Sequence, residues 1–154
     1  MHMRLVSFLA VVLPTLSYGQ SDSVAALADR VMRDEGQLMQ TVDSLSRCSA
    51  VYEIGAYLNE GDKATADVLL RTAEGARIAA LTLLGRHNFM KKREAKPDAA
   101  AYVLNVMKTS MTQLAAMVEN EQQALFQKEY EACVSLEDLR VELIQKMLDE
   151  LVER

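Results

Sequence analysis

Tryptophan is absent from this sequence, and aromatic residues make up only 5% of it. A hydrophobic core must therefore be built from leucine, valine, methionine and alanine. Half of the 154 residues are apolar, which is enough for one packed domain. Alanine and unbranched side chains cost least in a helix, whereas the β-branched and aromatic residues that favour strands are scarce. The composition predicts an all-α protein.

Histidine is also scarce, with only His2 and His87. A zinc site needs several cysteine or histidine ligands at short spacing. A di-iron bundle needs Glu-x-x-His pairs on two helices, but Leu84 stands where His87 would require the glutamate. No Cys-x-x-Cys-His motif for haem attachment occurs, and the nine methionines are typical of core filling. We therefore expect neither a metal nor another cofactor.

The motifs of common catalytic sites are missing as well. The sequence has no Gly-x-Ser-x-Gly turn and no glycine-rich phosphate loop. The acidic pairs Glu119 with Glu121 and Glu129 with Glu131 are two residues apart, so they do not face each other on a helix. These absences predict a protein that is not an enzyme.

Basic residues are outnumbered, with 17 Lys and Arg against 22 Asp and Glu and a net charge of −5. Such a surface repels nucleic acid and anionic lipid. The one concentrated basic segment, Lys91–Arg93 with Lys96, is expected to be a solvated loop between helices. The sequence thus predicts no nucleic-acid partner.

The N-terminal residues have the pattern of a secretory signal peptide. Arg4 precedes an apolar run over Leu5–Leu13, Pro14 ends that run, and the small residues Ser17 and Gly19 precede a cleavage position. The run is shorter than the roughly 20 residues of a membrane-spanning helix. We predict cleavage after Gly19 and no membrane association of the mature protein. An uncleaved anchor and an ordinary first core helix are the alternatives.

Residues 1–19 are thus expected to be a signal peptide, and residues 20–154 a single helical-bundle domain. Apolar residues at helical spacing predict four helices, over 24–58, over 64–89, from 98 to Tyr130 or Cys133, and from Ser135 onward. Two helices hinged near Gly36 are the alternative for the first of them. We expect an up-down four-helix bundle with short connections. A stack of helical hairpins is the alternative.

Four stripes of apolar residues are expected to face the core. They are Val31, Leu38, Leu45 and Tyr52; Leu69, Ala76 and Leu83; Leu104, Met111, Val118 and Leu125; and Leu136, Leu139, Leu143, Met147 and Leu151. Val103, Met107 and Leu114 lie beside the third stripe.

Cys48 and Cys133 are the only cysteines, and both fall in apolar helical stretches. Two cysteines in an exported protein usually pair, so we predict a structural disulfide. Closing a loop of 85 residues would contribute roughly 4 to 5 kcal/mol through the lost chain entropy of the unfolded state. A redox-active or intermolecular role is the alternative, but reactive pairs usually have Cys-x-x-Cys spacing.

The segment Val51–Leu58 places apolar residues on nearly every side of its helix. One explanation is that other helices surround this segment. The other is a partner-binding surface made by Tyr52 and Tyr57 with Glu53 and Glu60 as its acidic rim, because tyrosine suits contacts that are dry at one end and wet at the other.

These features predict a non-catalytic helical domain, periplasmic or secreted, that binds another exported protein. An inhibitor or immunity-type protein fits this class, with its carboxylates facing a basic cleft of the partner. The alternative is a periplasmic carrier or sensor that holds a small apolar ligand inside a methionine- and alanine-rich bundle.

Overall fold

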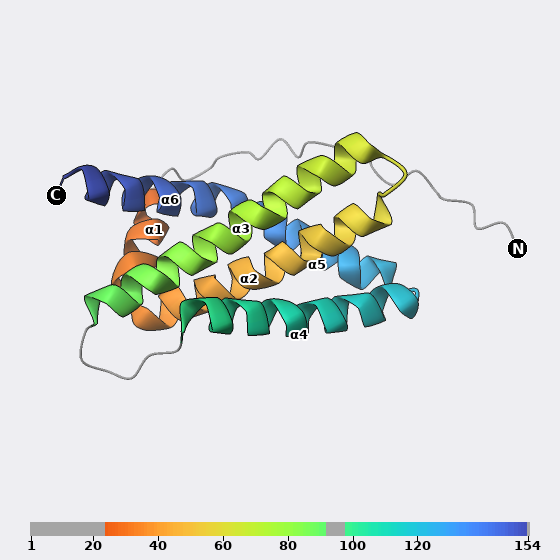
Figure 1. The fold of residues 1–154 in the computed structure, drawn as a ribbon, viewed down its shortest axis with the longest axis horizontal. Helices are drawn as coiled ribbons and strands as arrows, with labels where there is room; N and C mark the ends of the chain where they lie inside the picture. Colours follow the sequence, from red (N-terminus) through yellow and green to blue (C-terminus); the bar gives the residue numbers. More distant parts are fainter. Residues whose placement is uncertain (1–23, 92–97, 154) are drawn as a thin grey trace, which may run out of the picture.

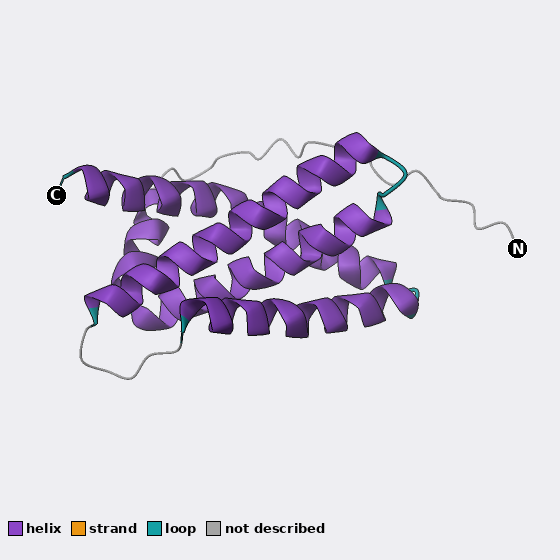
Figure 2. Cartoon of the chain, in the orientation of Figure 1, coloured by secondary structure: helices purple, strands orange, loops and turns teal. Residues whose placement is uncertain are grey.

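A computed structural model of the chain describes residues 24–91 and 98–153. The described residues form six helices and no strand: α1 (Val24–Arg33), α2 (Glu35–Leu58), α3 (Lys63–Met90), α4 (Ala99–Glu119), α5 (Gln123–Ser135) and α6 (Glu137–Val152). Short connections join most of them (Figure 2). The prediction of an all-α protein is confirmed. The predicted signal peptide and most of the predicted basic linker lie outside the described residues.

Helix α2 is the central helix. It packs against α3 most extensively and also against α4, α5 and α1. Helices α2, α3, α4 and the α5–α6 pair run in alternating directions, as in an up-down bundle, and α1 packs at one end beside α6 (Figure 1). This central position explains why Ala50, Val51 and Tyr52 are all buried although they lie on different sides of α2.

The break between α1 and α2 falls at Asp34, close to the hinge considered near Gly36. Asp34 has an extended backbone, and its side chain accepts a hydrogen bond from the amide of Gln37 at 2.8 Å. This bond satisfies a helix-end amide that would otherwise lack a partner. Asp62 caps α3 in the same way, at 3.3 Å from the amide of Thr65.

The predicted third helix was wrong in its length. Helix α4 ends at Glu119, and Glu121 turns the chain with a φ of 56° before α5 begins. Neither Gly nor Pro marks this turn, so composition gave no signal for it. The predicted start of the last helix at Ser135 was also wrong, because Ser135 ends α5, where its hydroxyl donates to the carbonyl of Ala132, and Leu136 is the boundary residue before α6.

The stripe predicted for the third helix was wrong as well. Val103, Met107 and Leu114 face the core, while Leu104 is 55% exposed and Met111 is 36% exposed. Two apolar stripes lie side by side on this helix, and periodicity alone does not decide which of them is buried. Leu125 and Leu151, also predicted to be buried, are exposed. The first two predicted stripes are buried throughout.

The core consists of two clusters. One joins α1, α6, the first half of α2 and the last half of α3, with Val103 and Met107 of α4. The other surrounds Cys48 and Cys133 between α2, α3 and α5, with Leu114 of α4. Leu136, between α5 and α6, packs against both clusters. On α3 the buried residues are largely alanines, which let α2 approach closely.

Candidate functional site

Cys48 of α2 and Cys133 of α5 form a disulfide, with a Cα–Cα distance of 5.3 Å. Both residues are buried, with 4% and 3% of their surface exposed, in the second core cluster. The cysteines are thus enclosed by core residues, and no free cysteine accompanies them in the described part of the chain. This environment suits a structural bond, because reactive cysteines are usually partly exposed.

Arg47, adjacent to the disulfide, connects three helices. Its Nε and Nη2 donate to the two carboxylate oxygens of Glu129 on α5 at 2.7 and 2.8 Å, and its Nη1 donates to Gln113 on α4 at 2.9 Å. Hydrogen bonds from Arg47 lower the pKa of Glu129, and those to Glu129 raise the pKa of Arg47. A bidentate pair of this kind fixes geometry as well as charge. The guanidinium is therefore already engaged within the protein.

Tyr52 lies in the core and not at an accessible surface. It is 2% exposed, and its hydroxyl donates to Glu137 at 3.2 Å. Its ring stands nearly perpendicular to the ring of Tyr130, with 5.7 Å between the two ring centroids. Burial, reinforced by the nearby carboxylate of Glu137, raises the pKa of Tyr52. Its predicted place in a partner-binding surface is therefore not supported by its position, since its ring and hydroxyl are both used internally.

The other three predicted residues are accessible near the end of α2. Tyr57 is 72% exposed, Glu60 is exposed in the following turn, and Glu53 lies one helical turn before Tyr57. Glu53 pairs with Arg77 of α3 at 3.8 Å. The structure thus brings Glu53 and Tyr57 to one side of α2 and leaves Tyr52 on another.

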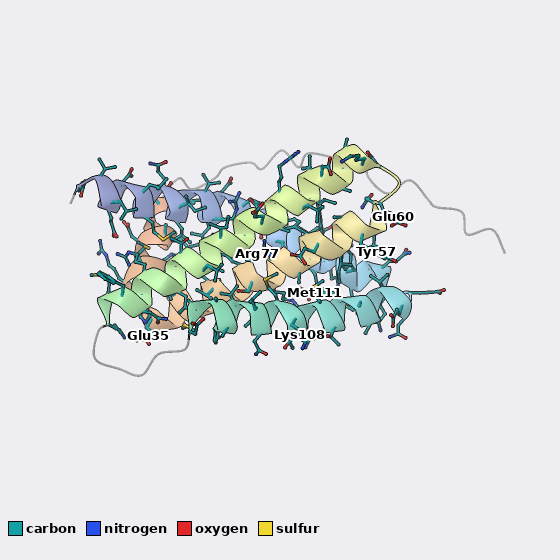
Figure 3. The ribbon with its side chains drawn as sticks, in the orientation of Figure 1. Glu35, Tyr57, Glu60, Arg77, Lys108 and Met111 are labelled. Carbon is teal, nitrogen blue, oxygen red and sulfur yellow. A yellow bond between two sulfur atoms is a disulfide. The ribbon has the colours of Figure 1, made fainter. Side chains whose placement is uncertain are left out.

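Arg77 extends this surface and was not predicted as a site residue. Figure 3 shows Arg77 on α3 and Tyr57 near the end of α2, and these two helices pack together. We call Glu53, Tyr57, Glu60 and Arg77 the Tyr57 surface. Arg77 could be placed only by the pairing of α2 with α3.

A shallow hollow of about 420 Å³ lies between α2 and α4. Its lining residues are Asp43, Ser44, Arg47, Asn105, Val106, Thr109 and Ser110. Most of these side chains are polar, and several already have partners: Tyr102 donates to Asp43 at 2.8 Å, and Ser44 donates to the carbonyl of Gln40. The hollow is open to solvent, so an apolar ligand bound there would stay partly in water.

His87 lies at the end of α3, where its Nε2 is 3.5 Å from a carboxylate oxygen of Glu35, which also pairs with Lys91. Hydrogen bonding from Lys91 lowers the pKa of Glu35. Among the described residues, no group of three or more His, Cys, Asp or Glu side chains is arranged to hold a metal ion. None of the described helices combines the length and hydrophobicity needed to cross a bilayer.

Comparisons with protein families, with curated proteins and with solved structures find no match to this chain. Its function is therefore inferred from the chemistry and geometry of its own residues.

Proposed function

We propose that this protein is an exported, non-catalytic helical domain that binds another exported protein through the Tyr57 surface. The observation that carries the proposal is the 72% exposure of Tyr57 beside the pair between Glu53 and Arg77. Tyrosine and arginine are enriched in protein interfaces, and both are frequent among the residues that dominate binding energy. When a partner covers a large aromatic ring that is exposed to water, the free energy of the complex is lowered.

Two features support export. A buried disulfide is typical of proteins that fold in oxidising compartments, such as the periplasm or the extracellular space. The N-terminal sequence has the charge, apolar run and small residues of a signal peptide. Together they favour a periplasmic or secreted location.

The acidic character of the chain favours a basic partner. With a net charge of −5, and with Glu53 and Glu60 on the Tyr57 surface, the protein would attract a positively charged cleft and associate faster at low salt. An inhibitor or immunity-type protein that covers the cleft of a toxin or a cell-wall hydrolase fits this chemistry. Binding that does not change with salt concentration would contradict this electrostatic part of the proposal.

The carrier alternative has one observation in its favour, the hollow of about 420 Å³, which falls within the range of about 300–1,000 Å³ for ligand sites. Its open shape would leave a bound apolar ligand partly in water. A protein partner is therefore the better-supported proposal.

A photocrosslinking residue at position 57 tests the proposal directly. We expect ultraviolet light to join the variant to one exported protein in its host, and the purified pair to bind in solution. The matched control carries the same residue at Thr112, an exposed position of α4 outside the Tyr57 surface. Equal crosslinking from positions 57 and 112, or no crosslink from position 57, would count against the Tyr57 surface.

A further inference from the structure

A second exposed surface runs along the C-terminal helices. Four apolar side chains, Val134, Val141, Leu148 and Val152, are 40%, 57%, 51% and 87% exposed. Single exposed apolar residues are common and need no explanation. These four differ because they recur at intervals of seven, seven and four residues, which places them along one face of a helix. We call this set the C-terminal stripe.

The stripe continues across the boundary between α5 and α6. Leu136 alone separates the two helices, and its φ of −90° and ψ of −8° keep it near helical geometry. Leu139, Leu143 and Met147 occupy the opposite face of α6 and are buried in the core. Helix α6 is therefore apolar on two faces, although packing within this chain uses only one of them.

Carboxylates border the C-terminal stripe. Glu131, Asp138 and Asp149 are exposed and occupy one edge of it at helical spacing. Of the basic residues of α5 and α6, Lys128 lies before the stripe begins, Arg140 pairs with Glu137, and Lys146 pairs with Asp29 of α1 and with Glu142. This edge of the stripe is thus acidic from Glu131 to Asp149.

This charge distribution identifies the kind of partner. A second copy of the chain would bring the same carboxylates close to one another, which is unfavourable. An anionic lipid surface would be repelled by them as well. A protein segment with apolar residues at helical spacing and Lys or Arg along its border would bury the stripe and neutralise its edge.

From this placement we infer that the C-terminal stripe is a second protein-docking surface, which takes an amphipathic helix with a basic border. It lies on α5 and α6, whereas the Tyr57 surface lies on α2, the turn after it, and α3. The two surfaces can therefore be tested separately.

The test uses the full chain with its disulfide and a fluorescein-labelled amphipathic peptide of leucine and lysine, followed by fluorescence anisotropy. We expect binding that weakens at least about tenfold in the double variant Val141→Ser, Leu148→Ser, because both apolar contacts are lost. The double variant Glu131→Gln, Asp149→Asn should bind more weakly at low salt and respond less to added salt. Tyr57→Ser should leave this binding unchanged.

The matched control is Ile78→Ser, which removes a similarly exposed apolar side chain, 49% exposed, from α3. Circular dichroism should show that all variants keep their helical content. Three results would overturn the inference. A leucine–glutamate peptide could bind as tightly as the leucine–lysine peptide, Ile78→Ser could weaken binding as much as the Val141, Leu148 double variant, or that double variant could bind as tightly as the unchanged protein. Sedimentation that reveals a dimer abolished by the Val141, Leu148 variant would overturn it too, because the stripe would then contact a second copy.

Discussion

The side chain of Arg47 connects three helices, because it bonds to α4 and α5 from α2. We predict that Arg47→Met lowers the free energy of unfolding by about 1–2 kcal/mol, a value reduced for the partial exposure of the pair. Urea unfolding followed by circular dichroism measures this loss. The control Lys63→Met removes a solvent-exposed pair with Asp67 and should cost less than about 0.5 kcal/mol.

The same variant should change the response to acid. Since hydrogen bonds from Arg47 lower the pKa of Glu129 below its ordinary 4.5, the folded protein holds this carboxyl ionised more readily than the unfolded chain does. The stabilisation is complete above about pH 4.5 and is lost as the pH falls further. Arg47→Met should therefore flatten the decline of stability in acid, and an unchanged decline would contradict the role given to this pair.

Tyr52 should make the protein sensitive to alkali. Burial raises the pKa of Tyr52 above its ordinary 10.0, so above that pH the unfolded state releases the proton more readily and stability falls. We predict that Tyr52→Phe costs about 1 kcal/mol at pH 7, because the bond to Glu137 is lost, and that it reduces the fall above pH 10. Unfolding across pH 7–11 tests both points. Tyr57→Phe, at an exposed position, should change stability at pH 7 by less than about 0.5 kcal/mol.

At the scale of elements, the turn between α4 and α5 contains the one non-glycine residue with positive φ in the described part of the chain, Glu121. A left-handed backbone costs an L-residue about 1–2 kcal/mol, whereas glycine adopts it freely. We predict that Glu121→Gly raises the free energy of unfolding by about 0.5–1 kcal/mol, after the greater chain entropy of glycine is deducted. Thermal unfolding checks this, with Glu119→Gly at the helical end of α4 expected to destabilise. A loss of stability in Glu121→Gly would show that the turn gains more from its side chain than from relief of φ.

The disulfide acts at the scale of the whole molecule, because its loop of 85 residues includes α3, α4 and part of α5. We predict that Cys48→Ala with Cys133→Ala lowers the free energy of unfolding by about 4–5 kcal/mol. Alanine is chosen over serine because serine would leave an unpaired hydroxyl in the core. In urea unfolding, the oxidised protein should have a high midpoint, and the reduced protein and the variant should have similar, lower midpoints. Equal midpoints for all three would show that the disulfide does not stabilise the fold.

Export can be checked on the intact protein. Mass spectrometry of material recovered from its host should give a chain that begins at Gln20, with two thiols labelled only after reduction. A chain that keeps Met1 and has two reactive thiols would place the protein in a reducing compartment, and the proposal of an exported inhibitor would lose its basis.

The sequence alone determined the helical class, the cysteine pairing and the buried stripes of α2 and α3, because a central helix and its main partner leave a strong period in their apolar residues. It predicted the accessible Tyr57 and Glu60 but also placed the buried Tyr52 with them. The crowded segment Val51–Leu58 admitted two explanations. The structure surrounds most of it with helices and leaves Tyr57 in water, while the binding of a partner there stays a prediction.

Tertiary structure alone decided the rest. On α4 two apolar stripes compete, and only the position of α2 selects Val103 and Met107 over Leu104. The break at Glu121 lacks glycine and proline. Local hydrogen bonds of Asn120 and Gln122 close the end of α4, and α5 then packs against α2 and is joined to it by the disulfide. The pairing of Glu53 with Arg77 and the apolar outer face of α6 likewise depend on which helices meet. Helical periodicity reports how residues are arranged around one axis, and it carries no information about where the neighbouring axes lie.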